Sequence, residues 1–175
     1  MYRLDQFNLP KKFRGKNNLI VQIWRTTYVL LYRPSPQIMY GWRRFLLRLF
    51  GAKIGTKVVL RPSSHITYPW KLEIGDYSWI GDDVFLYNLG NITIGANTII
   101  SQKSYICTGS HDYNSTNFAI YQKPIVIGNS CWIATDVFVG PGTTIADEVV
   151  VGARSSVFKD LLEKGVYKGN PLKKS

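Results

Sequence analysis

A chain of 175 residues can bury one sizeable core, and 45% hydrophobic with 19% charged residues is typical of a folded globular protein, which excludes wholesale disorder. Its two cysteines, Cys107 and Cys131, are too few for a disulfide framework and fit a reducing cytoplasm. The formal net charge of +11 comes entirely from residues 1–61, which hold thirteen lysines and arginines and a single acid, Asp5.

Residues 1–53 are predicted to form a basic amphipathic arm with two short helices, at 19–33 and 37–49, separated by Pro34 and Pro36. No run of about 18 uncharged apolar residues occurs, so no spanning helix is expected. No signal peptide is expected either, because residues 1–16 are polar and the apolar stretch at 19–32 is broken by Gln22, Arg25, Thr26 and Thr27. An arm of this charge suits an anionic membrane, a polyanionic acceptor or nucleic acid, or it is simply a solvated helical face.

From residue 54 to residue 160 the sequence repeats with a period of six. An Ile, Leu or Val occupies fifteen positions in five sets of three: 54, 60 and 66; 74, 80 and 86; 94, 100 and 106; 127, 133 and 139; 145, 151 and 157. Neither a helix nor an alternating strand has this period. Three short strands per coil, each with one large apolar residue pointing inward, predict an all-β parallel β-helix of five coils, shaped as a triangular prism. Residues 161–175 are expected to be a C-terminal tail.

The repeat is interrupted in three places. Two extra residues stand at 72–73 and again at 92–93, and each pair is expected to bulge a corner. The hexads that start at Ile106 and Ile127 are 21 residues apart instead of six, so residues 112–126 are expected to leave the prism as a loop. Loops on a rigid scaffold often carry function.

His111, one of only two histidines, lies where this loop leaves the prism. Histidine, with a reference pKa of about 6.5, is the side chain best suited to accept a proton near neutral pH. A hydroxyl nucleophile needs such a base, because it must lose its proton as it attacks. Without further information, composition favours the simpler interpretation of His111 as a surface histidine at the base of a loop. His65 is expected to be structural.

Four segments carry a resemblance to a known family. They are the run Thr108-Gly-Ser-His-Asp-Tyr113, residues 127–135 around Trp132, residues 151–160, and the pentad Gly169-Asn-Pro171-Leu-Lys173. With the hexads, they resemble the hexapeptide-repeat acyltransferases, and within them the colanic-acid-type exopolysaccharide O-acetyltransferases, over nearly the whole chain. The resemblance implies left-handed coils, against the usual right-handed rule, and acetyl-CoA-dependent transfer to a saccharide hydroxyl.

The resemblance also implies roles for single residues. His111 is expected to be the general base of a direct transfer, without an acyl-enzyme. The residues expected to contact acetyl-CoA are Trp132, Ala134, Thr135, Ala153, Phe158, Lys159 and Lys173; at position 158 many relatives carry a small or polar residue. Backbone N–H groups near Ala134 and Thr135 are expected to bond the pantetheine amides or the developing oxyanion. Asp83 and Tyr113 are expected on the acceptor side, although Asp83 equally suits the cap of a corner.

A single prism offers no deep groove, so the resemblance implies a homotrimer with each site between two neighbours. The expected enzyme is cytoplasmic, either free or at the inner face of a membrane that its arm contacts. We expect it to need no metal and to bind no nucleic acid. The alternatives are transfer to a small molecule (serine, a maltose-like sugar or an antibiotic) and a non-catalytic β-helix used for assembly. A zinc carbonic anhydrase on the same prism would need three histidine ligands, and the chain has two histidines.

Overall fold

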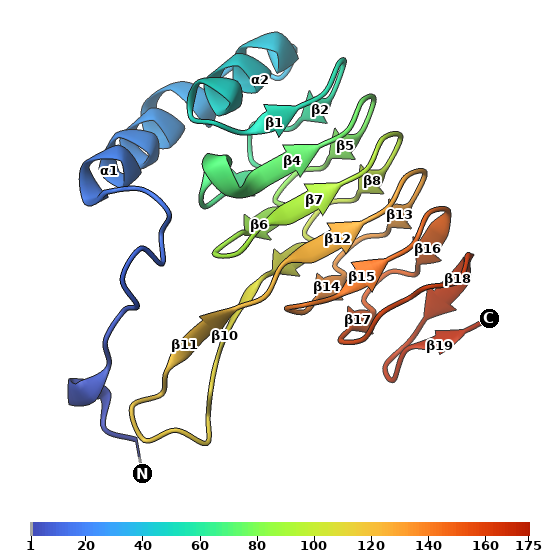
Figure 1. The fold of residues 1–175 in the computed structure, drawn as a ribbon. Helices are drawn as coiled ribbons and strands as arrows, with labels where there is room; N and C mark the ends of the chain where they lie inside the picture. The colour runs from blue at the N-terminus through green and yellow to red at the C-terminus, as the bar shows by residue number, and fades with distance from the viewer. Residues whose placement is uncertain (1) are drawn as a thin grey trace.

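The computed structural model describes residues 2–175, and most of them wind into a three-sided solenoid of parallel strands (Figure 1). Face A consists of β1 (Lys53–Ile54), β4 (Leu72–Ile74), β7 (Ile92–Ile94), β12 (Ile125–Ile127) and β15 (Thr144–Ile145). Face B consists of β2 (Val59–Leu60), β5 (Trp79–Ile80), β8 (Ile99–Ile100), β13 (Trp132–Ile133), β16 (Val149–Val151), β18 (Gly165–Lys168) and β19 (Lys173–Lys174). Face C consists of β3 (His65–Ile66), β6 (Phe85–Tyr87), β9 (Tyr105–Cys107), β14 (Phe138–Val139) and β17 (Ser156–Val157).

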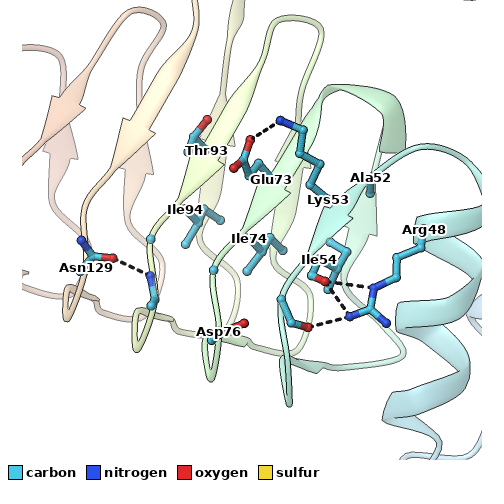
Figure 2. A pocket seen from close by; sticks show the side chains of 14 residues that line it. Arg48, Ala52, Lys53, Ile54, Glu73, Ile74, Asp76, Thr93, Ile94 and Asn129 are labelled. Atoms are coloured by element: carbon cyan, nitrogen blue, oxygen red, sulfur yellow. Dashed lines mark hydrogen bonds and ion pairs between the residues drawn. The ribbon is translucent and has the colours of Figure 1, made fainter.

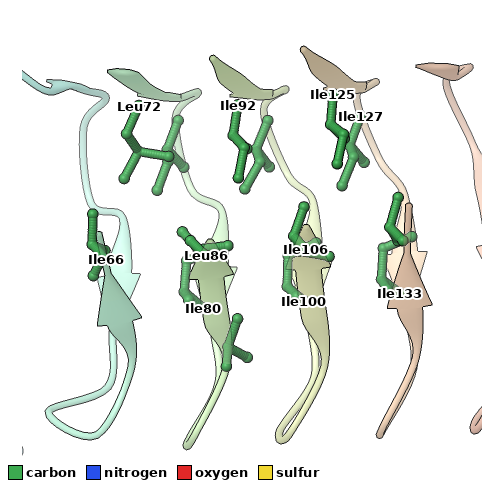
Figure 3. Packing of buried hydrophobic residues seen from close by; sticks show 14 of the residues in the cluster. Ile66, Leu72, Ile80, Leu86, Ile92, Ile100, Ile106, Ile125, Ile127 and Ile133 are labelled. Carbon is green, nitrogen blue, oxygen red and sulfur yellow. The ribbon is translucent and has the colours of Figure 1, made fainter. Parts of the chain in front are cut away.

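The period of six produces the core of this solenoid. All fifteen hexad residues are buried, and strand pairing aligns them from coil to coil, as in the row Ile80, Ile100 and Ile133 on face B (Figure 3). Each fully buried aliphatic side chain contributes about 1.5 to 3 kcal/mol relative to an exposed one. No single coil encloses such a core, so stability comes from stacking the coils.

The predicted corner bulges are wrong. The extra residues at 72–73 and 92–93 lengthen β4 and β7 to three residues, with Leu72 paired to Ile92. The same lengthening recurs in β12, where Ile125 pairs with Ile92. The added apolar residues Leu72, Ile92 and Ile125 are buried, so they extend the core of face A instead of distorting a corner.

The winding also continues beyond residue 160, where the sequence analysis ends the solenoid. Leu161 forms a parallel bridge to Ile145 and is buried, and β18 pairs in parallel with β16. The five predicted coils are therefore followed by a partial sixth turn. β19 then folds back antiparallel to β18, in the segment predicted as a tail.

A helical cap, residues 18–49, covers the first coil (Figure 1). It follows a short 3-10 helix, η1 (Leu4–Gln6), and contains α1 (Asn18–Thr27), the π-helix η2 (Tyr28–Tyr32) and α2 (Tyr40–Leu49). The Asn17 side chain starts α1 by accepting a hydrogen bond from the backbone N–H of Ile20 at 2.9 Å. Within residues 2–175, no helix has the length and apolar character needed to cross a membrane.

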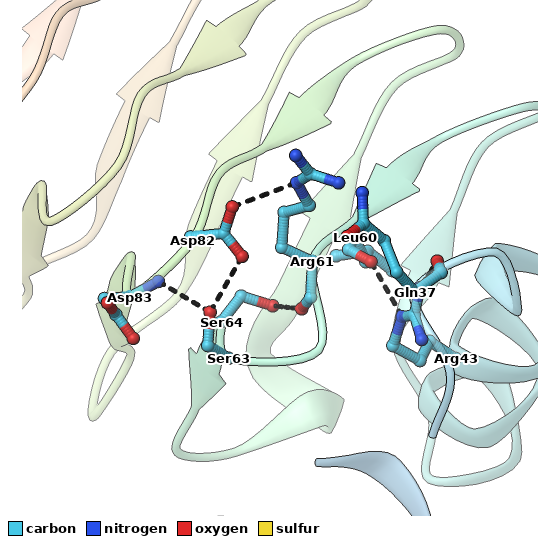
Figure 4. A network of polar contacts seen from close by, with 8 residues as sticks. All are labelled: Gln37, Arg43, Leu60, Arg61, Ser63, Ser64, Asp82 and Asp83. Carbon is cyan, nitrogen blue, oxygen red and sulfur yellow. Dashed lines mark hydrogen bonds and ion pairs between the residues drawn. The ribbon is translucent and has the colours of Figure 1, made fainter. Parts of the chain in front are cut away.

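Buried Arg43 fastens this cap to the first coil. Its guanidinium donates to Leu60 O at 2.7 Å on the solenoid and to Gln37 O at 2.5 Å in the cap (Figure 4). Within the cap it also donates to Ser35 Oγ at 2.8 Å and to Pro36 O at 2.9 Å. Since no acidic partner takes part, the charge is stabilised by these oxygens.

Candidate active site

The chain leaves the solenoid after β9 as a twisted hairpin of β10 (Gly109–His111) and β11 (Ile120–Gln122), which projects from the prism (Figure 1). The expected loop at 112–126 therefore begins and ends earlier, because residues 125–127 already belong to face A. Gly109 is required at the base of the hairpin, since a Cβ there would lie 2.6 Å from Leu89 Cδ1.

His111 lies at the end of β10, outside the solenoid core and half-buried. Its Nδ1 is 2.8 Å from Phe118 O. A carbonyl oxygen only accepts, so Nδ1 carries the proton of the neutral ring and Nε2 has a free lone pair. The imidazole also stacks on the Phe118 ring, with centroids 4.2 Å apart and planes 10° apart. The ring is thus held in the tautomer and orientation that a general base requires.

The first residues of the chain lie against the tip of this hairpin. Arg3 N donates to Thr116 O at 2.7 Å, and the Tyr2 ring lies 4.8 Å from that of Phe118. The Phe7 ring lies 6.1 Å from the His111 imidazole, so aromatic rings of two different segments flank it.

Lys71, at the end of the 3-10 helix η3 (Pro69–Lys71), links three segments beside the hairpin. Its ammonium donates to Phe13 O at 2.7 Å in the arm, to Leu89 O in the solenoid, and to Gln122 Oε1 at 3.1 Å in β11. Burial lowers the pKa of Lys71. Around it, Phe13, Val21, Tyr68 and Leu89 form a second hydrophobic cluster, which Ile120 of β11 joins.

Four of the residues expected to contact the cofactor lie along one edge of the prism. Trp132 points outward from face B, is 50% exposed and donates its indole N–H to Ser101 Oγ at 3.0 Å. Ala134, Thr135 and Ala153 lie in the corner between faces B and C, in the fourth and fifth coils.

One of the two amides expected to face a ligand in this corner is already used. Ala134 N donates to Val151 O at 3.0 Å as part of the solenoid ladder, so the expectation that it is free is wrong. Every parallel ladder consumes the amides next to its strands in this way. Thr135 N donates no hydrogen bond within residues 2–175 and remains available.

The last coil forms a cavity of about 460 Å³ whose walls include Phe158, Lys159 and Pro171. The structure therefore brings together two more of the expected cofactor residues and the tail. Phe158 is strongly exposed and lies 5.4 Å, ring to ring, from Phe138. Lys173 lies in β19 beside Lys168, outside the lining of this cavity.

The two expected acceptor residues are both exposed but lie apart. Asp83 occupies a corner between faces B and C with φ of 55°, and its backbone N–H is bonded to Ser63 Oγ at 3.0 Å (Figure 4). The sequence analysis gave this position at a corner as the alternative to acceptor binding for Asp83. Tyr113 is exposed at the tip of the hairpin.

His65, the second histidine, stacks on Phe85 on face C with ring centroids 4.1 Å apart, and burial lowers the pKa of its imidazole.

A single chain does not bring the base and the expected cofactor residues together. His111 follows β9, at the corner between faces C and A, whereas Thr135 and Ala153 lie at the corner between faces B and C. A cavity of about 650 Å³ runs along face A past Arg48, Glu73 and Asn129, and its lining includes neither the base nor the expected cofactor residues (Figure 2). Within residues 2–175 no three His, Cys, Asp or Glu side chains cluster as a metal site would require.

Sequence reasoning missed three residues around the hairpin: Phe7 and Phe118, whose rings flank the His111 imidazole, and Lys71, which bonds Gln122 of β11. Phe118 lies seven residues after His111 in an irregular loop, and the other two are distant in the sequence. No spacing rule connects such positions, so only the fold reveals their contacts.

Comparisons with known proteins agree with this geometry, although no family model matches the chain. The chain is 62% identical over 171 residues to a provisionally named colanic acid biosynthesis acetyltransferase, WcaF, of Escherichia coli (strain K12), covering 98% of this chain and 94% of the relative. The structure of a maltose O-acetyltransferase from Clostridium difficile 630 matches with a TM-score of 0.83 and 25% identity over 94% of each chain. A hexapeptide-repeat acetyltransferase from Vibrio cholerae O1 biovar eltor, complexed with acetyl coenzyme A, matches with a TM-score of 0.80 and 25% identity over 89% of this chain and 85% of that one. These likenesses confirm the predicted left-handed β-helix.

Proposed function

The chain belongs to the hexapeptide-repeat acetyltransferases, so we propose that it transfers acetyl from acetyl-CoA to a saccharide hydroxyl with His111 as general base. The observation that carries this proposal is the bond between His111 Nδ1 and Phe118 O, which leaves Nε2 free to take a proton. The saccharide is proposed because the relative at 62% identity is named for colanic acid biosynthesis.

The proposed step needs two groups of the protein. His111 Nε2 removes the acceptor proton while the hydroxyl oxygen attacks the thioester carbonyl. Thr135 N, which is free of internal bonds, is suited to donate to the oxyanion that forms. When the tetrahedral intermediate collapses, CoA thiolate leaves and the imidazolium returns the proton to it. The sugar ester and free CoA are the products.

Transfer is proposed to be direct. The nearest cysteine in sequence, Cys107, is buried, and burial raises the pKa of its thiol, which disfavours the thiolate that an acyl-enzyme would need. Its Sγ is moreover directed at Gly109 O, 3.1 Å away.

The active unit is proposed to be a homotrimer, with acetyl-CoA along the B–C corner of one copy and His111 supplied by the next. Support comes from the separation of these residues on one chain and from the apolar side chains outside face B. Trp79, Ile99 and Trp132 are aligned there by strand pairing and are exposed. The residues proposed to contact the cofactor in this arrangement are Trp132, Ala134, Thr135, Ala153, Phe158, Lys159 and Lys173. Asp83 and Tyr113 are proposed to contact the acceptor.

Thiol release tests the proposed reaction. The purified chain is incubated with acetyl-CoA and either exopolysaccharide oligosaccharides, maltose or serine, and free CoA is followed with a thiol reagent. We expect release that depends on a saccharide acceptor and an acetyl ester on the sugar by mass spectrometry. Release that is the same without acceptor, or only with serine, would contradict the proposal.

Lys71→Met is expected to lower kcat about tenfold, because a small displacement of the hairpin that carries the base His111 slows the reaction strongly. KM for acetyl-CoA should be unchanged, because Lys71 lies away from the corner of the prism that is proposed to bind the cofactor. Methionine keeps the apolar stem of the side chain and removes its three hydrogen bonds. Lys71→Arg should recover part of the rate, since the arginine still donates. Lys164→Met, at an exposed lysine paired with Glu148, is the matched control. A kcat equal to that of the control would show that Lys71 does not position His111.

A further inference from the structure

The helical cap exposes an unusual number of large apolar side chains. Nine of them lie within residues 19–49: Leu19, Ile23, Val29, Leu30, Leu31, Ile38, Met39, Phe45 and Leu49. A surface helix normally keeps its apolar side chains on the face that it buries. Here apolar side chains occupy the buried face and the exposed face alike.

The exposed residues follow helical periodicity. Leu19, Ile23 and Leu30 are four and seven residues apart, which places them on one side of α1 and η2, opposite the buried Val21 and Trp24. On α2, Phe45 and Leu49 are four residues apart and lie opposite the buried Leu47.

The two exposed stripes belong to one rigid unit. Trp42 of α2 stacks on Phe45 at 5.8 Å and donates its indole N–H to Leu31 O of η2 at 2.9 Å. This bond fixes α2 to η2, which continues directly from α1, so the two stripes belong to one connected unit. We call residues 19–49 with these outward side chains the cap surface.

The positive charge around the cap surface indicates that its partner is anionic. Between Asp5 and Glu73 the chain has thirteen lysines and arginines and no acid. Arg25 and Arg33 form no ion pair within residues 2–175, and both line a cavity of about 480 Å³ with the aromatic rings of Tyr28 and Phe85. The exposed side chain of Val29 lines the same cavity, and a guanidinium group beside an exposed apolar side chain matches a phosphate headgroup beside acyl chains.

We propose that the cap surface binds an anionic phospholipid bilayer peripherally. Leu19, Ile23 and Leu30 enter the boundary between headgroups and acyl chains, and Arg33, which lines a cavity together with the exposed Val29, contacts lipid phosphates. The solenoid then stands with its first coil toward the lipid. This inference is independent of the acetyl transfer proposed above, and it extends that proposal by bringing the enzyme to the surface where a lipid-anchored saccharide would be found.

Vesicle flotation tests the proposal with the whole protein. Vesicles of phosphatidylcholine mixed in equal parts with phosphatidylglycerol are compared with vesicles of phosphatidylcholine alone. We expect binding to the mixed vesicles that weakens as salt is raised, and little binding to the neutral ones. Failure to float with the anionic vesicles, or equal flotation with both, would overturn the proposal.

A matched pair of variants locates the contact. Leu30→Ser in the cap surface and Leu162→Ser at the far end of the solenoid remove leucines of similar exposure, 64% and 68%. Leu30→Ser should lower the partition coefficient about tenfold, and Ile23→Ser with Leu30→Ser on the order of a hundredfold, while Leu162→Ser changes nothing. Thiol release with a soluble acceptor should persist in all three, which separates this test from the test of the reaction. If Leu30→Ser instead splits a larger assembly on size exclusion without changing flotation, the cap surface covers a second copy and the lipid proposal is wrong.

Discussion

Replacing His111 with alanine is expected to lower kcat for acetyl transfer by about a thousandfold, because a positioned general base contributes on the order of 10² to 10⁴. KM for acetyl-CoA should stay close to that of the wild type, since the residues proposed to hold the cofactor lie at another corner of the prism. The measurement is steady-state thiol release at saturating acceptor.

The other histidine supplies the control. His65 packs between Tyr28 and Phe85 on face C, with ring distances of 5.0 and 4.1 Å, so His65→Ala removes an imidazole of similar size from a site without a proposed catalytic role. It should keep most of the activity. If His111→Ala kept more than a tenth of the wild-type rate while remaining folded, His111 would not be the base.

Arg43→Ala is expected to reduce the free energy of unfolding by about 3 to 5 kcal/mol, because it leaves a cavity and strands oxygens that the guanidinium now bonds. Four oxygens lose their donor, one on the solenoid and three in the cap. The loss is read from denaturant unfolding at a fixed protein concentration.

Arg33→Ala is the comparison, since Arg33 is an exposed arginine of the same cap and surface changes usually stay within about 0.5 kcal/mol. Equal losses for the two variants would mean that the buried network does not fasten the cap to the first coil. The same experiment bears on the cap surface, because that surface is rigid only while the cap stays docked.

The solenoid was predictable because its period of six is a property of the sequence that depends on no distant contact. Ile54 and Ile74 sit at equivalent hexad positions, and strand pairing places them side by side. The extra residues at 72–73 and 92–93 were wrongly predicted to bulge from corners, because the length of an insertion does not distinguish a bulge from a longer strand. Leu161 and β18 were missed because the hexad pattern fades before the winding stops.

The candidate site was predictable only in part. The interruption after Ile106 pointed to His111, and the structure gives that imidazole a carbonyl partner at Nδ1. The occupied amide of Ala134 was not predictable, because hydrogen bonding at a corner depends on the coil below. The hydrogen bonds of Lys71 were not predictable for the same reason, since their acceptors belong to residues 13, 89 and 122, which are distant in the sequence.

The most direct test of a site shared between copies is complementation in mixed trimers. His111→Ala removes the base, and Ala153→Trp, at an exposed position of the B–C corner, blocks the proposed path of the cofactor; each variant alone should be nearly inactive. When the two are unfolded and refolded together, random assembly into trimers should restore about a quarter of the wild-type sites, because each site draws on two chains. A mixture that forms trimers but stays as inactive as its components would contradict the shared site.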